Sequence, residues 1–197
     1  MNTTNNLTTE QLKAIALKQF LGEDFFILFT ENEVLIYEGT EEEAREQFEA
    51  DIEGTEEANI DANFEIFCIN NLTEVEEYNE NDYNNDYLVL TDEEADEKAR
   101  EQILDSVWAF NASFLAEQTD IDIEVFEAIQ NNGRCESNNK AILSMIDDED
   151  SFVEAAISAD GRGHFLAGYD FNENEETVLL YDKGDSANPT FYIYRQN

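Results

Sequence analysis

Carboxylates are the reactive groups that dominate this sequence. Its 197 residues contain 48 Asp and Glu against 10 Lys and Arg, which gives a formal net charge of −38. A surface with this charge repels phosphates, so the composition argues against direct binding to nucleic acid or to an anionic membrane. Any charged partner is expected to be basic, because only a positive surface is attracted by such a field.

The acidic residues are concentrated in the middle of the chain. From Glu46 to Glu97 there is no Lys or Arg, whereas Asp and Glu number 19. A long helix is expected to overlap the end of this block, and more acidic residues fall on its outer face. We therefore expect a partner-binding set of carboxylates at Glu46, Glu49, Asp51, Glu53, Glu56, Glu57, Glu74, Glu76, Glu77, Glu80, Asp82, Asp86, Asp92, Glu93, Asp96, Glu97, Glu101 and Asp105.

Such a set of carboxylates could stand in for the phosphates of DNA. B-DNA carries one charge per about 1.7 Å of its axis, so a charge of this size matches roughly 65 Å of duplex. The sequence therefore predicts a non-enzymatic DNA mimic that occupies the basic DNA-binding groove of a host protein, such as a restriction or CRISPR-type nuclease. This hypothesis requires the carboxylates to gather into one band, without Lys and Arg interleaved among them.

Two other interpretations of the acidic composition stay open. A general acidic interaction module would bind a basic patch on a partner protein without copying the spacing of phosphates. A surface adapted to salt or solubility would also be acidic, although the 21 Asn and the excess of Glu over Asp, 31 to 17, are not typical of a salt-adapted protein. A homodimer is also considered, since pairing would lengthen a mimic of duplex DNA.

Other residue types offer little catalytic chemistry. His164 is the only histidine, and it would need a nucleophile such as Cys135, which lies in no recognisable nucleophile motif. Cys68 and Cys135 are too few and too far apart for a disulfide framework or a zinc site. The glycines form neither of the common phosphate-binding patterns, GxxxxGK[ST] and GxGxxG. We therefore expect no catalytic residues and no cofactor.

Calcium binding is a weaker alternative, suggested by one short segment. Asp170, Asn172 and Asn174 occupy positions one, three and five of a calcium-loop pattern. Glu175 stands where that loop requires Gly, and Tyr181 stands where it requires a bidentate Glu. The sequence therefore predicts no specific metal site, only weak association of divalent cations with an anionic surface.

Hydropathy places the chain away from membranes. No apolar run approaches the roughly 18 residues of a membrane-spanning helix. Residues 1–11 also lack the basic and apolar regions of a signal peptide. We therefore expect a cytoplasmic protein, in the host cell if it is phage-encoded.

The elements that must position these groups indicate an α+β fold. A capping box at Thr8 and Gln11 predicts the first helix, which is expected to end near Gly22. The rest of the N-terminal part is expected to form a hairpin from strands at 25–29 and 34–37, a short helix that begins at a capping box of Thr40 and Glu43, and a strand at 64–69.

The C-terminal part is expected to be a helical cluster with a small antiparallel sheet. An exposed acidic loop at 74–86 leads into it, so the chain divides into a subdomain at 1–75, a loop at 76–86 and a second subdomain at 87–197. The expected elements are a strand at 87–90, a helix capped by Thr91 and Glu94 with an inner stripe of Ala95, Ala99, Ile103, Leu104, Val107 and Trp108, short helices around 125–129 and 141–146, a helix capped by Ser151 and broken by Gly161, and strands at 165–169, 177–182 and 190–195.

Four motifs stand out in this C-terminal part: Trp108–Leu115 (WAFNASFL), Asp160–Leu166 (DGRGHFL), Tyr169–Asp170 and Tyr192–Arg195 (YIYR). With these motifs, residues 87–197 resemble a set of acidic proteins encoded by phages and prophages. The sequence departs from that set at Phe171, where a glycine is expected. The resemblance implies a phage or mobile-element setting and no particular activity. In overall composition, the chain also resembles antirestriction and anti-CRISPR proteins that imitate DNA.

Overall fold

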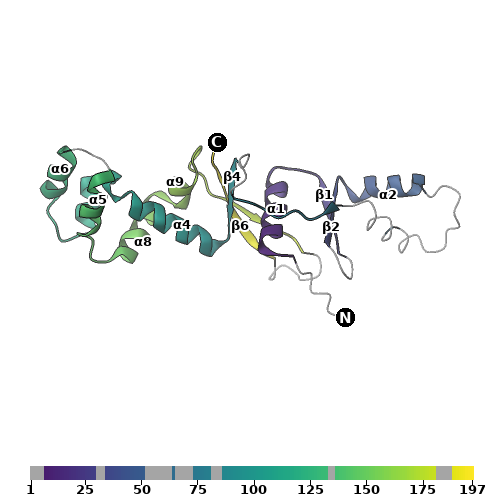
Figure 1. Ribbon diagram of the computed structural model, residues 1–197, viewed down its shortest axis with the longest axis horizontal. Helices are drawn as coiled ribbons and strands as arrows, with labels where there is room; N and C mark the ends of the chain where they lie inside the picture. Colours follow the sequence, from purple (N-terminus) through teal and green to yellow (C-terminus); the bar gives the residue numbers. More distant parts are fainter. Residues whose placement is uncertain are drawn as a thin grey trace. The chain divides into compact units, whose positions relative to one another are not determined.

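The fold is α+β, as the sequence predicts. The computed structural model describes residues 7–29, 34–51, 64, 73–80, 86–132, 136–180 and 188–197. Within these residues, helices accompany two three-stranded sheets, with strand orders β1-β2-β3 and β4-β6-β5 (Figure 1). The chain divides into two compact units, residues 1–85 with 176–191 and residues 86–175 with 192–197. The sequence-based division places all of 87–197 in one subdomain, whereas this division assigns 176–191 to the first unit.

In the first unit, helix α1 begins at the predicted capping box. Thr8 Oγ1 accepts a hydrogen bond from the backbone N–H of Gln11 at 3.2 Å, and the Gln11 side chain accepts one from the Thr8 N–H at 2.9 Å. The helix spans Thr9–Phe20, and it buries Ile15 and Ala16. The two reciprocal bonds satisfy N–H groups that the first turn of a helix leaves without partners.

The predicted hairpin follows α1. Strand β1 (Phe25–Phe29) pairs antiparallel with β2 (Val34–Glu38), with Ile27 opposite Ile36. A third strand, β3 (Thr73–Glu74), pairs antiparallel with β2. The sequence gives no signal for β3, because two residues are too few to show the alternation that identifies a strand.

Helix α2 (Glu41–Asp51) begins at the second predicted capping box. The Thr40 N–H donates to Glu43 Oε2 at 2.8 Å, and the Glu43 N–H donates to Thr40 Oγ1 at 3.3 Å. Three acidic residues occupy the first turn, where the positive end of the helix dipole favours them.

A small core forms under α2. Ala44, Phe48 and Phe64 are buried together, and the rings of Phe48 and Phe64 meet edge to face at 5.5 Å. Phe64 is helical, so the strand predicted at 64–69 is wrong at its first residue. Residues 65–69 lie outside the described part of the chain.

The acidic loop predicted at 74–86 is not exposed throughout. Val75 and Tyr78 are buried, at 5% and 8% exposure. The Val75 carbonyl accepts a hydrogen bond from the Gln11 side chain at 3.2 Å, and the Tyr78 N–H donates to a backbone carbonyl of α1 at 3.0 Å. The start of the segment is therefore fixed on α1, while residues 81–85 lie outside the described part.

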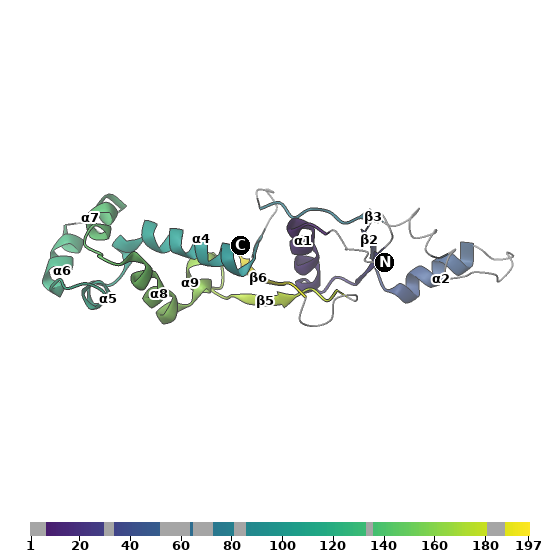
Figure 2. The same cartoon turned by 90° about the horizontal axis from the view of Figure 1, so that it is seen from below.

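The second unit begins with β4 (Tyr87–Leu90) and α4 (Asp92–Asp105), which start as predicted. The predicted inner stripe of the helix includes Val107 and Trp108, but α4 ends at Asp105 and these two residues lie in a separate 3₁₀ helix. The capping box of Thr91 and Glu94 is present in both directions. Strand β4 pairs antiparallel with β6 (Thr190–Arg195), which the sequence also predicts. Figure 2 shows α4 alongside two later helices, α8 and α9, with which it is in contact.

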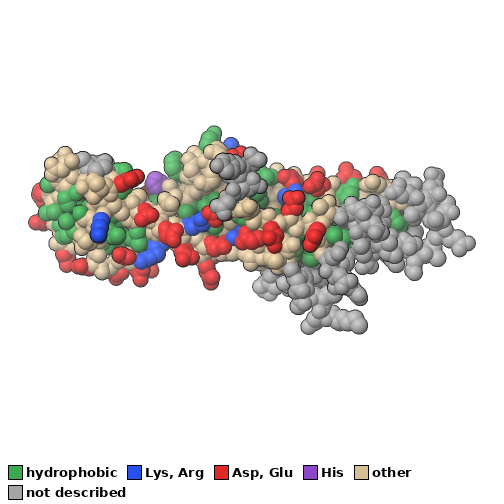
Figure 3. Space-filling model, in the orientation of Figure 1, with side chains coloured by type: hydrophobic (Ala, Val, Ile, Leu, Met, Phe, Trp, Pro, Cys, Tyr) green, Lys and Arg blue, Asp and Glu red, His purple; other side chains and the backbone are tan. Residues whose placement is uncertain are grey.

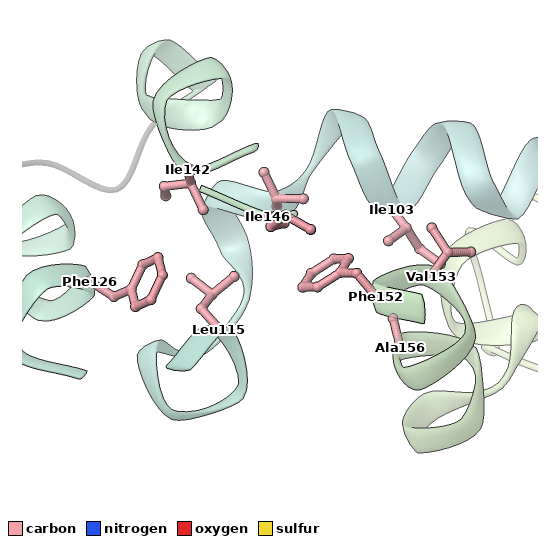
Figure 4. Close-up of a cluster of buried hydrophobic side chains, with 9 residues drawn as sticks. Ile103, Leu115, Phe126, Ile142, Ile146, Phe152, Val153 and Ala156 are labelled. Atoms are coloured by element: carbon pink, nitrogen blue, oxygen red, sulfur yellow. The ribbon is translucent and has the colours of Figure 1, made fainter. Parts of the chain in front are cut away.

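A cluster of short helices surrounds the end of α4. Its buried side chains include Leu115, Phe126 and Phe152, which pack with Ile103 of α4 in one hydrophobic core (Figure 4). In the helix predicted around 125–129, Phe126 is buried, whereas its neighbour Val125 is 42% exposed. The elements of the cluster are η1 (Val107–Ala109), α5 (Ala112–Glu117), α6 (Ile123–Asn131), η2 (Glu136–Asn138), α7 (Asn139–Leu143) and α8 (Glu149–Asp160).

The cap of helix α8 lies three residues before the predicted cap, Ser151. The cap is Asp148, whose carboxylate accepts hydrogen bonds from the Ser151 N–H at 3.0 Å and from the Ser151 hydroxyl at 2.9 Å. These bonds hold the pKa of Asp148 below its ordinary value. Ser151 is thus a partner of the cap, because the carboxylate is a stronger acceptor than a hydroxyl for the N–H groups of the first turn.

The end of the chain differs from the predicted meander. Residues predicted as a strand at 165–169 begin inside helix α9 (Arg162–Leu166). Strand β5 covers Asn174–Thr177, so the strand predicted at 177–182 is wrong at 178–180, which form no strand. A short apolar run is compatible with either a buried helix or a strand, and here tertiary packing selects the helix.

A close backbone approach fixes the segment between α9 and β5. A Cβ atom at Gly163 would lie 2.5 Å from the carbonyl oxygen of Phe171 and 2.8 Å from the nitrogen of Glu173. Phe171 itself has a φ of 59°, in the left-handed region that glycine adopts most readily. The backbone at Phe171 therefore has the conformation that would favour the glycine expected there from the resemblance.

We predict that Gly163→Ala lowers the free energy of unfolding by about 1–3 kcal/mol, because the added methyl group must displace backbone. Denaturant unfolding followed by circular dichroism measures the change. Ser158→Ala, an exposed substitution on α8, is the control and should change it by less than about 0.5 kcal/mol. Equal stabilities of the two variants would contradict the close approach.

Candidate functional site

Helix α4 presents two opposite faces. Ala95, Ala99 and Ile103 are fully buried and attach the helix to the rest of its unit. On the opposite side, acidic side chains recur every four residues, which places them along one stripe of the helix. This acidic row, as we call it, consists of four exposed residues: Glu93, Glu97, Glu101 and Asp105.

The acidic row consists of charges without ionic partners. Successive members are about 6 Å apart along the helix axis. Within the part of the chain that the structure describes, none of the four forms an ion pair. Like charges four residues apart on a helix repel one another, at a cost of about 0.2–0.5 kcal/mol per pair. Burial of the opposite face of α4, which contains Ala95, Ala99 and Ile103, therefore stabilises the helix against this repulsion.

Over its length, α4 approaches one DNA strand in the number of anionic groups per unit length. Its sequence, DEEADEKAREQILD, has seven acidic residues among 14. A helix of this length is about 21 Å long, which gives one carboxylate per about 3 Å. One strand of B-DNA has one phosphate per about 3.4 Å. Lys98 and Arg100 offset part of this charge, so the agreement concerns the carboxylates and not the net charge.

One arginine organises the side of α4 next to the acidic row. Arg162 of α9 is only 11% exposed, and its Nη1 lies 2.7 Å from Asp92 Oδ1 and 2.9 Å from Asp96 Oδ1. Its Nε and Nη2 donate to the two carboxylate oxygens of Glu173 at 2.8 and 3.1 Å. The guanidinium also lies over the ring of Tyr192, 4.4 Å from its centroid. Arg162 thereby joins α4, α9 and the segment that leads to β5.

Ionisation in this Arg162 cluster follows from these contacts. Burial alone would lower the pKa of Arg162, but hydrogen bonds to Glu173, Asp92 and Asp96 raise it overall. The Tyr194 hydroxyl donates to Glu173 Oε2 at 2.6 Å, and burial together with this bond raises the pKa of Tyr194. The cluster therefore keeps Arg162 as a cation and Tyr194 as a neutral phenol at neutral pH.

The Arg162 cluster separates two groups of predicted carboxylates. Asp92 and Asp96 are in ion pairs, so a cation is interleaved with the carboxylates on this side of α4. The acidic row stays unpaired among the described residues. Asp86 is exposed and accepts a hydrogen bond from the Asn197 amide at 2.8 Å. Of the predicted set in this unit, the acidic row is the part that can meet a basic partner with its full charge.

The other predicted carboxylates belong to the first unit or lie outside the described residues. Those whose side chains are described are all exposed: Glu46, Glu74, Glu76, Glu77 and Glu80. Glu49 and Asp51 are in α2, with side chains outside the description, and four more positions lie outside the described residues altogether: Glu53, Glu56, Glu57 and Asp82. The structure therefore brings together the α4 carboxylates within one unit, and it describes those of the first unit as a separate set.

Sequence reasoning missed a second ion cluster. Arg100 Nη2 lies 3.1 Å from Glu149, and its Nη1 lies 2.5 Å from Asp150. The partners are about 50 residues away in sequence, so helix periodicity does not reveal them. The composition does offer a general signal, because any cation in so acidic a chain will find several carboxylates nearby.

The weaker candidate sites are not assembled in the described residues. His164 is exposed and stacks on Phe171 at 5.5 Å, while Cys135 lies outside the description. Asp170 accepts a hydrogen bond from the Asn172 N–H at 3.1 Å, and the Asn174 amide donates to the carbonyl of Ile193 at 3.2 Å. Among the described residues, no group of three or more His, Cys, Asp or Glu is placed to hold a metal ion.

Neither a membrane-spanning helix among the described residues nor a known relative indicates the function of this chain. None of the helices described is long and apolar enough to cross a membrane. No protein-family model matches the chain, and neither does any curated protein or solved structure. The geometry and charge of the chain itself are therefore the features that bear on its function.

We predict that Arg162→Met lowers the free energy of unfolding by about 2–3 kcal/mol, because it leaves Glu173 and its neighbours without their buried cation. Arg100→Met is the matched control. Its side chain is 37% exposed, so the loss should stay within about 1 kcal/mol. Both values come from denaturant unfolding at equal ionic strength. If the two substitutions cost the same, Arg162 does not organise the cluster.

Proposed function

We propose that this chain is a non-enzymatic DNA mimic. In this proposal, the acidic row of α4 takes the place of phosphates along one DNA strand and binds in the basic DNA-binding groove of a host protein, such as a restriction or CRISPR-type defence nuclease. The observation that carries the proposal is the exposed row, unpaired among the described residues, with a spacing of about 6 Å along the helix axis. The resemblance to phage-encoded acidic proteins supports the setting.

The energetics of α4 support an interaction role for the row. Glu93, Glu97 and Glu101 repel one another, and the nearby Arg162 is engaged with other carboxylates. The repulsion between Glu97 and Glu101 costs stability, and Gln at these two positions would preserve the helix without that cost. A basic partner would supply the missing counter-charges and turn repulsion into attraction. Opposite fields would also speed encounter, and added salt would weaken binding.

A general acidic interaction module is the second candidate. The observation that favours it is the ion pairing of Asp92 and Asp96 with Arg162, which removes two charges from the helix where a DNA strand would have regular phosphates. Such a module would bind a basic patch on a partner without excluding DNA from it. Competition with DNA therefore distinguishes the two candidates.

We predict that the triple variant Glu93→Gln, Glu97→Gln, Glu101→Gln retains at most about a tenth of the wild-type capture of DNA-displaceable proteins. Three charge-assisted contacts would be lost, each of which is worth about 1.5–3 kcal/mol. The purified chain is immobilised, incubated with a bacterial lysate, and eluted with a duplex of about 20 base pairs. Buffer of equal ionic strength without DNA serves as the blank.

The same variant should be at least as stable as the wild type. Removal of the like-charge pairs is expected to raise the melting temperature by up to about 4 °C. The matched control also removes three negative charges, at exposed positions elsewhere on the second unit. Its substitutions are Glu117→Gln, Asp120→Asn and Glu124→Gln. Equal loss in both triples would place the contact outside the acidic row. Captured proteins that duplex DNA does not displace would favour the general module.

A further inference from the structure

A groove in the second unit is built from two motifs that the acidic row does not use. Its volume is about 610 Å³, within the range usual for ligand sites. One wall comes from the motif at 108–115 and the other from the motif at 160–166. The residues that matter here are Phe110, Phe114, Asp160, His164 and Phe165.

Aromatic packing makes the floor of this groove rigid. Phe110 stacks on Phe114 with ring centroids 5.3 Å apart and on Phe165 at 6.1 Å. Phe152, which is buried, packs edge to face with Phe110 at 5.3 Å and with Phe114 at 5.5 Å. Phe110, Phe114 and Phe165 are only partly buried, so the packing holds them in place while part of their surface stays accessible.

The rim of the groove is negative. Asp160 is exposed in the last turn of α8, where the helix dipole adds negative potential and no basic side chain opposes it. Among the described residues that line the groove there is no Lys or Arg. The complementary ligand is therefore a cation that also has an apolar or planar surface.

An exposed aromatic side chain contacts His164, one of the residues that line the groove. His164 meets Phe165 edge to face at 5.1 Å and stacks on Phe171. Phe171 is 60% exposed, and its φ of 59° is strained for a residue with a side chain. A large apolar ring held exposed in a strained conformation costs stability, and such costs are concentrated at binding sites.

The chain already binds its own arginines with similar groups. Arg162 lies over Tyr192 at 4.4 Å while it pairs with Glu173, and Arg45 lies over Phe64 at 4.4 Å while it pairs with Glu41. In both cases a guanidinium covers an aromatic ring and meets a carboxylate. The groove offers aromatic rings and a carboxylate with no arginine of the described chain among its lining residues.

We infer that this groove binds an arginine side chain presented by a protein partner. The guanidinium lies against the exposed phenylalanine surface and pairs with Asp160, and an apolar neighbour in the partner contacts His164 and Phe171. Arginine fits better than lysine, because its planar guanidinium stacks on rings and donates two parallel hydrogen bonds to a carboxylate. The inference uses no residue of the acidic row, so it stands or falls independently of DNA mimicry.

The test titrates the full chain with acetyl-Leu-Arg-Leu amide and follows the imidazole protons of His164 by NMR. His164 is the only histidine, so its signals identify the groove without further assignment. The control peptide has Lys in place of Arg, which keeps the charge and removes the planar group. In about 150 mM salt, where long-range attraction is screened, the Arg peptide should give saturable shifts and bind at least about fivefold more tightly than the Lys peptide.

Two protein variants place the contact in the groove. Asp160→Asn should weaken the Arg peptide about fivefold or more, and Ala159→Leu, at an exposed position that lines the groove, should block it sterically. Asp120→Asn makes the same charge change elsewhere in the unit and should bind like the wild type. Equal binding of the two peptides, unsaturable His164 shifts, or wild-type binding by Ala159→Leu would overturn the inference.

Discussion

Mutual repulsion among 48 carboxylates is the constraint under which this chain folds. Ten cations cannot neutralise them, so stability must come from apolar burial and from local hydrogen bonds that use the carboxylates as acceptors. Both are present. Glu43 and Glu94 close capping boxes, Asp148 caps α8, and Phe126 and Phe152 are buried in the core of the second unit. Carboxylates that take no part in these hydrogen bonds lie on the surface, and Figure 3 shows many Asp and Glu side chains on one face.

Two arginines of the second unit are placed where they join elements. Arg162 connects α4 with α9 and the segment before β5, and Arg100 connects α4 with α8. Each of these arginines faces at least two carboxylates, so the ion clusters remain negative while they hold the unit together. Structural pairing and a surplus of surface charge are therefore compatible, because Arg162 pairs with Asp92 and Asp96 while the acidic row has no ion pair among the described residues.

Two surfaces of the second unit suit different features of a basic partner. The acidic row offers charge at regular intervals, which long-range attraction can use without close fit. The aromatic groove offers shape and a single carboxylate, which require contact with a particular side chain. A protein that used both would gain speed of encounter from the first and selectivity from the second, since electrostatic steering by itself discriminates poorly among basic proteins.

Local signals in the sequence determined the elements whose stabilising contacts lie close together along the chain. The capping boxes at Thr8, Thr40 and Thr91, the hairpin of β1 and β2, and the buried stripe of α4 were all predictable, as was the acidic row itself, because each depends on neighbours along the chain. Tertiary structure decided what depends on distant partners. The pairing of Arg162 with Asp92, about 70 residues away, the choice of helix over strand at α9, and the meeting of two motifs in one groove have no local signature, since their energies arise from contacts that exist only after the chain has folded.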